Sequence, residues 1–281
     1  MLELFLFSRM KIFAICLAKN EVDIIEHCLR QASVWAEKII VYDNGSTDGT
    51  WELVQQLAAE NPTIIAWKQD GKPFNNYLRG EAFEAHRHLA RKGDWWCFRL
   101  DADELYPQDP RPHLRATPAY YHVVAKESIE YVLTHEDLVE HDFTNLLPVQ
   151  FDRIRHYAPL SYSEVRFFRH RDRLRWEIGA TMPRFLGITS PKRVRVLHYQ
   201  YRSIPQLKRR LEVRAEARRH GHPNWQVVDT GDWRNMLFHR RDALYDEGNK
   251  SWAPRGSLNK FLSPWYLSAV KLLIFGLGIL P

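Results

Sequence analysis

The first hundred residues alternate between short apolar runs and amphipathic segments, and this alternation restricts the fold more than any other feature. In the amphipathic segments, apolar residues recur every three or four positions, as they do on one face of a helix. The predicted strands are 12–18, 38–42, 63–67 and 95–100, and the predicted helices are 21–35, 50–60 and 76–91. Strands that alternate with helices form a mostly parallel sheet with right-handed crossovers. The sequence therefore predicts an α/β fold.

The pattern changes beyond Pro107, where shorter strands of mixed composition replace the regular alternation. The expected elements in this part are strands at 120–125, 165–169 and 193–199 and a helix at 204–220. We divide the chain into an α/β domain at 10–203, a basic helical extension at 204–260 and an apolar tail at 261–281.

Charge is distributed unevenly along the chain. Residues 1–152 contain 15 Lys and Arg against 24 Asp and Glu, whereas residues 153–260 contain 24 against 10. A basic second half favours anionic partners, which include the phosphates of a substrate, an acidic membrane surface and nucleic acid. Charge alone does not choose among them.

The apolar tail is too short to cross a bilayer. Residues 265–280 are apolar except for Ser268 and Lys271, but a membrane-spanning helix needs roughly 20 such residues. Trp265 and Tyr266 are typical of a helix that lies in the membrane interface. The alternative is a helix packed on the domain or at an oligomer contact.

The cysteines indicate a reducing compartment. Cys16, Cys28 and Cys97 lie in apolar stretches without Cys-x-x-Cys spacing, so we expect neither a disulfide framework nor a zinc site. A cytoplasmic protein fits this pattern best.

Two carboxylates follow the fourth predicted strand, at Asp101 and Asp103. In an extended segment, side chains at i and i+2 point the same way, so both could face one hard cation such as Mg²⁺ or Mn²⁺. That cation would bridge the two phosphates of a nucleoside diphosphate and neutralise charge on the leaving group. A solvated acidic turn is the alternative.

A second polar cluster, at residues 43–48, follows the second predicted strand. Ser46, Thr47 or Asp48 is expected to cap the following helix, whereas Asp43 stands at the strand end and can accept hydrogen bonds from a base or ribose. Residues 18–21 end the first strand and would line the same crevice, because parallel sheets bind ligands at the carboxyl ends of their strands.

Together, three segments resemble the signature of family 2 glycosyltransferases with the GT-A fold, and most closely the branch of lipopolysaccharide core glucosyltransferases. They are Cys16–Glu21, Val41–Thr50 and Leu100–Glu104. The resemblance implies a GT-A type, mostly parallel sheet flanked by helices, with nucleotide-sugar binding and catalysis in residues 10–203 and a C-terminal helical extension.

The resemblance also implies roles for individual residues. Asp103 would ligate the metal and His198 would complete its site, because imidazole is a credible ligand for Mn²⁺. The residues expected to bind the nucleotide sugar, commonly through uridine, are Ala18, Asn20, Glu21, Asp43, Asn44, Arg79 and Asp101. Of these, Asp101 would contact ribose or metal, and Arg79 corresponds only loosely to an arginine that precedes the Asp-x-Asp strand in the family.

The catalytic base is expected at Glu177. An inverting transfer needs a carboxylate within hydrogen-bond reach of the acceptor hydroxyl. Relatives often carry His-Glu after an Arg-rich strand, but this chain reads Trp176-Glu177, so the usual pair is missing. An ion pair of Glu177 with Arg175 or Arg184 is the alternative.

These features predict an inverting glycosyltransferase that moves a hexose from a nucleoside diphosphate sugar to a glycan or lipid-linked acceptor, with Mn²⁺ or Mg²⁺ as cofactor. We expect it at the inner face of the cytoplasmic membrane, in contact with an anionic membrane surface and not with nucleic acid. A sugar nucleotidyltransferase is one alternative, but residues 16–21 lack the glycine-rich phosphate loop of that class. A non-catalytic protein that binds membrane or nucleic acid through its basic half is the other.

Overall fold

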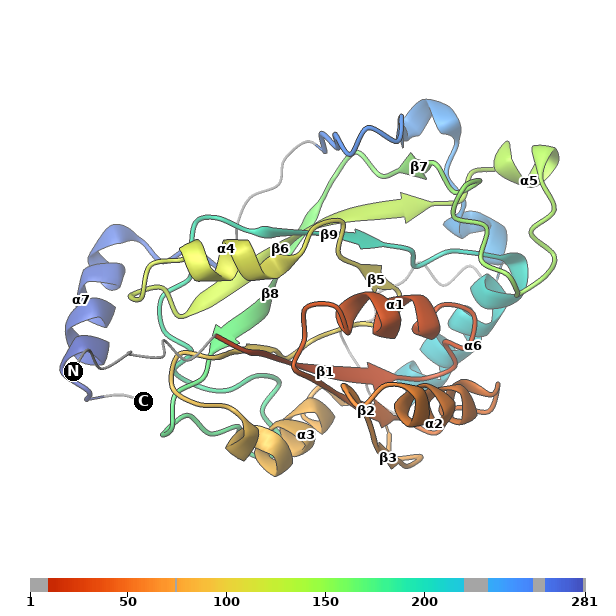
Figure 1. Ribbon diagram of the computed structural model, residues 1–281. Coiled ribbons are helices and arrows are strands. Elements are labelled where there is room, and N and C mark those ends of the chain that lie inside the picture. The colour runs from red at the N-terminus through yellow and green to blue at the C-terminus, as the bar shows by residue number, and fades with distance from the viewer. Residues whose placement is uncertain (1–9, 74, 220–231, 255–260, 280–281) are drawn as a thin grey trace, which may run out of the picture.

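The computed structural model describes residues 10–73, 75–219, 232–254 and 261–279. A mixed sheet with helices on both faces runs through the described part of the molecule (Figure 1). Its strands are β1 (Ile12–Ala18), β2 (Lys38–Asp43), β3 (Ile64–Gln69), β4 (Trp95–Cys97), β5 (Glu104–Leu105), β6 (Val123–Val132), β7 (His156–Tyr157), β8 (Tyr162–Arg169), β9 (Val194–His198) and β10 (Leu244–Tyr245). The α-helices are α1 (Ile25–Ala32), α2 (Thr50–Glu60), α3 (Leu78–His86), α4 (Pro110–Ala116), α5 (Asp137–Glu140), α6 (Ile204–Arg219) and α7 (Trp265–Gly276).

The first four strands form the parallel half of the sheet. β1 lies between β2 and β4, β3 follows β2, and all three pairings are parallel. The α/β prediction is confirmed, and each predicted helix of this half is present. The helix predicted at 21–35 begins only at Ile25, because residues 22–24 form a turn.

Burial on both faces explains why β1 is a continuous apolar run. Ala14 and Cys16 pack into the core shared with α1 and α2, whereas Phe13 and Ile15 pack on the other face with Phe83 of α3. A strand covered on both sides needs apolar residues at every position, and this is typical of parallel sheets. The loops that follow β1, β2 and β4 therefore start from strands that are packed on both faces.

The second half of the sheet is mixed. β8 pairs antiparallel with β4 and β6, and β9 pairs parallel with β6. The strand predicted at 120–125 was wrong in its extent, because β6 starts at Val123 and continues to Val132. Its later residues include Lys126 and Glu130, which read as surface residues but are buried against charged partners.

The C-terminal helices lie on different sides of the molecule. α6 follows β9 and lies beside the carboxyl ends of β1 and β2, whereas α7 lies on the opposite side (Figure 1). Both occupy the segments where the sequence predicted helices. Of the helices that can be described, none combines the length and the apolar character needed to cross a membrane.

Candidate functional site

The loops after β1 and β2 are held together by hydrogen bonds. The backbone N–H of Asn20 donates to Ser46 Oγ at 2.8 Å, and the N–H of Thr47 donates to Asn20 Oδ1 at 2.8 Å. Asn20 has φ of 57°, in the left-handed region that Asn tolerates better than most residues. The N–H of Glu21 donates to Thr50 Oγ1 at 2.9 Å, so residues 20 and 21 are fixed by the neighbouring loop.

The residue that precedes helix α2 is Gly49, with φ of 96°, and not one of the three predicted capping residues. Asp48 stands one position earlier and still serves the helix start, because its Oδ1 accepts the N–H of Thr50 at 3.1 Å. Its other oxygen pairs with Arg209 of α6 at 2.7 Å. Asp48 therefore connects the end of β2 to the C-terminal half of the chain.

Asp43 and Asn44 are fully buried at the end of β2, beside Ala18 at the end of β1. Asp43 Oδ1 accepts the N–H of Ser46 at 2.8 Å and Gln69 Nε2 at 3.1 Å. The second oxygen of Asp43 and Oδ1 of Asn44 have no hydrogen-bond donor among the described residues. An unsatisfied buried acceptor costs about 1–3 kcal/mol, so a donor group supplied by a ligand would be bound favourably at either atom.

Asp101 is surrounded by arginines. It pairs with Arg79 of α3 at 2.8 Å, with Arg166 of β8 at 3.1 Å and with Arg99 at 3.4 Å. Burial alone would raise the pKa of Asp101, but the three guanidinium groups outweigh it and hold that pKa well below its usual value. Arg79, which was expected to bind the nucleotide sugar, is buried and contacts Asp101, and its role towards a nucleotide stays a prediction.

Asp103 has a different set of partners, which includes a histidine. His198 Nε2 lies 3.2 Å from Asp103 Oδ2, and Arg210 of α6 approaches the same oxygen at 3.2 Å. The other ring nitrogen of His198 lies 2.6 Å from Glu130 Oε2. Burial disfavours the charged imidazole, but the two carboxylates raise the pKa of His198 to about 10. Without a metal, the two carboxylates therefore favour the protonated imidazole, and a metal ion bound at Nε2 would replace the proton on that nitrogen.

The two carboxylates of the Asp-x-Asp segment do not share one face. The N–H of Glu104 donates to the carbonyl of Asp101 at 3.1 Å, so residues 101–104 form a turn and not the extended segment that the sequence predicted. A turn rotates successive side chains away from the alternation of a strand. Asp101 consequently faces Arg79 and Arg166, while Asp103 faces His198 and Arg210.

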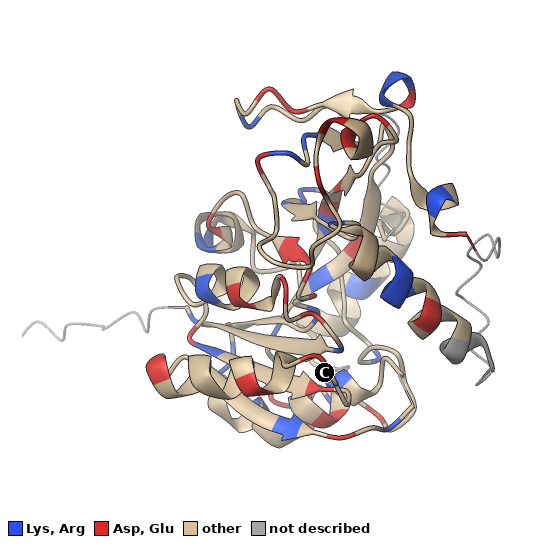
Figure 2. Cartoon of the chain, turned by 90° about the vertical axis from the view of Figure 1, so that its right-hand side faces the viewer, with Lys and Arg blue, Asp and Glu red and all other residues tan. Residues whose placement is uncertain are grey.

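Arg202 connects the end of β1 to this cluster. Its fully buried guanidinium pairs with Glu21 at 2.6 Å and Asp23 at 2.7 Å, and it lies 3.9 Å from Asp103. Burial raises the pKa of Glu21 to about 7 in spite of Arg202. With Arg209 on Asp48 and Arg210 on Asp103, the segment 202–210 thus pairs with acidic residues after β1, β2 and β4. Figure 2 shows how basic and acidic positions are distributed along the described chain.

A divalent cation fits part of this arrangement. Asp103 Oδ2 and His198 Nε2 are close enough to be neighbouring ligands of one ion, and Glu130 holds the other ring nitrogen as carboxylates do for metal-binding histidines. Within the described residues, however, no three or more His, Cys, Asp or Glu side chains form a group that could hold a metal. Asp103 and His198 would therefore supply two ligands, and the others would have to come from substrate or water.

Glu177 lies on an exposed loop. Its side chain is about half exposed and pairs with Arg184 at 3.2 Å, which is the alternative contact considered from the sequence. The preceding Trp176 packs tightly against Gly80 of α3, where a Cβ would come within 2.8 Å of the indole. The residue before Glu177 therefore packs on the helix that carries Arg79. The role of Glu177 as a base stays a prediction.

Three side chains central to this site were not assigned roles from the sequence: Glu130, Arg166 and Arg202. Arg210 was expected only as part of the basic helical extension. Arg166 lies in the strand predicted at 165–169, but a sequence does not show which of many arginines is buried. Glu130 lies in the part of β6 that was not predicted, and its pairing with His198 spans 68 residues. Only the pairing of β6 with β9, which places Glu130 opposite His198, brings them together.

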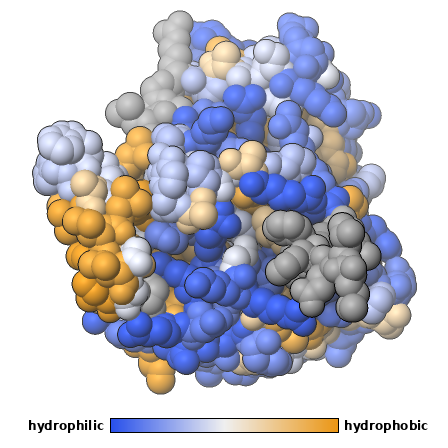
Figure 3. Space-filling view, turned by 60° about the vertical axis from the view of Figure 1, so that its left-hand side comes forward, coloured by the Kyte–Doolittle hydropathy of each residue, from blue (hydrophilic) through white to orange (hydrophobic). Residues whose placement is uncertain are grey.

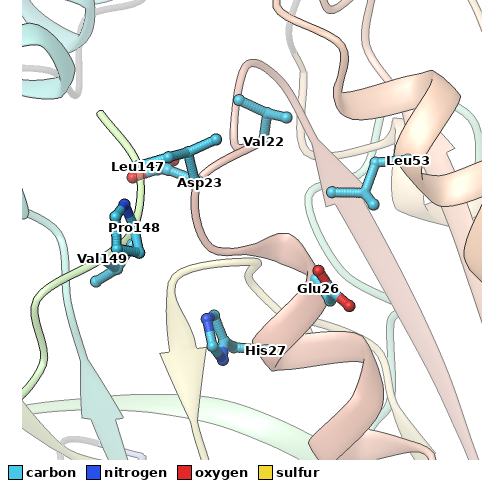
Figure 4. A pocket seen from close by; sticks show the side chains of 8 residues that line it. All are labelled: Val22, Asp23, Glu26, His27, Leu53, Leu147, Pro148 and Val149. Atoms are coloured by element: carbon cyan, nitrogen blue, oxygen red, sulfur yellow. The ribbon is translucent and has the colours of Figure 1, made fainter. Parts of the chain in front are cut away.

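A cavity of about 570 Å³ opens beside the start of α1 (Figure 4). Figure 4 shows Glu26 and His27 on one side and the loop of Leu147, Pro148 and Val149 on the other. The remaining lining residues are Val22, Asp23 and Leu53. The predicted site residues do not line this cavity, but Asp23 shares Arg202 with Glu21 and so adjoins the site.

Comparison with known proteins finds similarity mainly in the N-terminal part of the chain. Residues 14–116 match the family model described as Glycosyl transferase family 2. The lipopolysaccharide core biosynthesis glycosyltransferase LpsC of Rhizobium meliloti (strain 1021) is 36% identical over 93 residues, which are 33% of this chain and 30% of that protein. The match therefore spans under a third of the length of that relative. A solved mannosyltransferase, PcManGT from Pyrobaculum calidifontis in complex with GDP-Man and Mn²⁺, has a TM-score of 0.41 at 17% identity, covering 76% of this chain and 65% of its own.

Proposed function

We propose that the chain is a metal-dependent, inverting hexosyltransferase, because residues 14–116 match the model of glycosyl transferase family 2. The donor is a nucleoside diphosphate sugar, with uridine as the expected nucleoside. The acceptor is a lipid-linked or polysaccharide glycan at the inner face of the cytoplasmic membrane. The match to a lipopolysaccharide core glycosyltransferase supports an acceptor of this class.

The observation that carries the proposal is the meeting of acidic residues from three strand ends with one basic segment. Glu21, Asp48 and Asp103 follow β1, β2 and β4, and each pairs with an arginine between residues 202 and 210. A nucleoside diphosphate needs hydrogen-bond acceptors for its base and ribose and positive charge for its phosphates. Both are available at this edge of the sheet.

The residues divide into two groups by chemistry. The unsatisfied oxygens of Asp43 and Asn44 can accept hydrogen bonds from the base or ribose, next to Ala18 and Asn20. Asp103 and His198 would hold Mn²⁺ or Mg²⁺, which when bound would neutralise charge on the departing diphosphate. Glu130 orients His198, and Arg79 fixes the carboxylate of Asp101.

The remaining requirement is a base that takes the proton of the acceptor hydroxyl. We assign this role to Glu177, whose partner Arg184 is exposed and can be displaced. An exposed ion pair of this kind contributes roughly 0–1 kcal/mol, so acceptor binding could release the carboxylate at little cost.

Titration calorimetry tests the proposal directly. UDP, GDP and dTDP are titrated into the protein with Mn²⁺ or with a chelator, and we expect at least one nucleotide to bind more tightly when metal is present. Asp103→Asn should weaken that metal-dependent binding at least about tenfold, because it removes a charged ligand. Asp152→Asn, at an exposed position, is the matched control.

A product assay separates the enzyme classes. With UDP-hexoses and Mn²⁺, slow transfer to water should release UDP, whereas a nucleotidyltransferase would release pyrophosphate from a nucleoside triphosphate. Absence of metal-linked binding for every nucleotide, or full activity in Asp103→Asn, would remove the proposed function.

A further inference from the structure

Helix α7 has the reverse of the polarity expected for a helix on a globular protein. Its charged residue faces the protein, where Lys271 Nζ donates to Ser263 Oγ at 2.7 Å and to the carbonyl of Gly187 at 3.5 Å. Its apolar residues face outward, with Trp265 82% and Leu273 67% exposed. The other large exposed side chains of the helix are Tyr266, Leu267, Val270 and Leu272.

The orientation of α7 is fixed by specific contacts on its inner side. The ring of Phe275 lies 5.0 Å from that of His122 and 4.9 Å from the guanidinium of Arg171. Arg173 donates to the carbonyl of Gly278 at 2.9 Å, just beyond the helix. The outward apolar face is therefore a defined feature of the surface, because the inner side is already occupied.

A neighbouring loop extends the apolar face. The carbonyl of Phe185 accepts a hydrogen bond from Arg171, the same residue that covers Phe275, and the Phe185 side chain is about half exposed. Figure 3 shows hydrophobic residues gathered into one patch on this face of the molecule. Contiguous exposed patches of this kind mark interaction sites more often than scattered apolar residues do.

The charges around α7 favour an anionic occupant. Residues 261–279 contain Lys271 and no acidic residue, and two neighbouring side chains that contact this segment, Arg171 and Arg173, are also cationic. A second copy of the chain bound through a two-fold axis would bring the same basic rim against itself, which is unfavourable. An apolar face with a basic rim is instead complementary to a bilayer that contains anionic lipids.

We propose that α7 and Phe185 form a docking surface for an anionic lipid bilayer, with the helix lying flat in the membrane interface. Its 12 residues would extend about 18 Å, short of the roughly 30 Å hydrocarbon core. This surface deepens the proposed function, because it would bring the transferase to a lipid-linked acceptor. Docking itself needs neither nucleotide nor metal, so docking and transfer can fail independently.

Vesicle co-sedimentation tests the surface. The full chain should bind phosphatidylcholine vesicles that contain phosphatidylglycerol, bind pure phosphatidylcholine vesicles less well, and lose affinity as salt increases. Val270→Glu and Leu273→Glu should each lower the vesicle partition coefficient at least about tenfold, because a charge replaces an exposed apolar side chain that the bilayer would bury. The matched control is Val139→Glu in α5, where the valine is 87% exposed, and it should bind as the wild type does.

Two further measurements make the outcomes unambiguous. Thermal unfolding of the three variants confirms that each is folded, and light scattering gives the oligomeric state of each. Unchanged vesicle binding by folded Val270→Glu and Leu273→Glu would overturn the proposal. So would a wild-type dimer that ignores vesicles and becomes a monomer in these variants, because α7 would then be a contact between copies.

Discussion

Asp101 and Asp103 are two residues apart, yet they belong to electrostatic environments of different kinds. Asp101 is held by arginines, including the buried Arg79 and Arg166, whose charge is permanent. Asp103 is held by His198, which titrates, and by Arg210, which is partly exposed on α6, and it lies 3.9 Å from the buried Arg202. We infer that Asp101 is held in place by the fold, whereas His198 and Arg210 can leave Asp103 when a ligand binds.

Among the variants that test this comparison, Arg166→Met should cause the largest loss in the free energy of unfolding. Arg166 is fully buried and pairs with Asp101, Glu104 and Glu164, so Arg166→Met would leave the buried Glu104 with Lys126 as its one remaining cation among the described residues. Breaking a buried ion pair from one side costs about 3–5 kcal/mol. We expect a loss of that size in the free energy of unfolding, measured by urea denaturation.

Arg99→Met is the control for Arg166→Met. Arg99 also pairs with Asp101 and Glu164, but its side chain is 31% exposed. Its removal should cost no more than about 1 kcal/mol. Equal losses in the two variants would mean that Asp101 is not anchored by its buried partner, and the contrast with Asp103 would disappear.

Glu130→Gln should cause a smaller loss in the free energy of unfolding, and this loss should depend on pH. The attraction between Glu130 and His198 lowers the pKa of Glu130 to about 2, against the penalty of burial, and raises that of His198 to about 10. The stability from Glu130 is therefore present above its unfolded pKa near 4.5 and is lost as pH falls through 2. The stability from His198 is fully present below 6.5 and is lost as pH rises through 10.

The two windows overlap between pH 4.5 and 6.5, where both groups of the pair contribute fully. In that range, with chelator present, Glu130→Gln should lower the free energy of unfolding by about 2 kcal/mol, as expected for a hydrogen bond to a charged group. The deficit should shrink towards pH 10, as measured by denaturation at a series of pH values. A deficit independent of pH would indicate that only packing was lost.

The same contrast explains what the sequence could predict. The parallel half was predictable because strands such as β1 are buried on both faces and consist of apolar residues, and because polar and acidic loop residues come after them. β6 was predicted only in its first part, because Lys126 and Glu130 read as surface residues until Glu104 and His198 are known to lie opposite them.

The local turn at Asp101 was also beyond the sequence pattern. An Asp-x-Asp segment at a strand end is compatible with either an extended or a turned backbone, and a single hydrogen bond from Glu104 to Asp101 decides between them. The strand at 165–169 and the helix at 204–220 were predicted, but the partners of their arginines depend on tertiary packing. The order of apolar runs and acidic residues in the sequence therefore predicted the acidic edge of the sheet. Tertiary packing determines which of the two carboxylates is held by buried arginines.

The smallest predicted effect concerns Arg210. Its guanidinium lies 3.2 Å from Asp103 Oδ2, the same oxygen that faces His198, so Arg210 should compete with a divalent cation when no nucleotide is present. Arg210→Gln removes the competitor and should raise Mn²⁺ affinity about fivefold, as for a partly exposed pair worth near 1 kcal/mol.

Arg209→Gln is the matched control, because Arg209 pairs with Asp48. Calorimetric titration of the nucleotide-free protein with Mn²⁺ measures both variants. Weaker Mn²⁺ binding in Arg210→Gln than in Arg209→Gln would mean that Arg210 organises Asp103 and does not yield it to a metal.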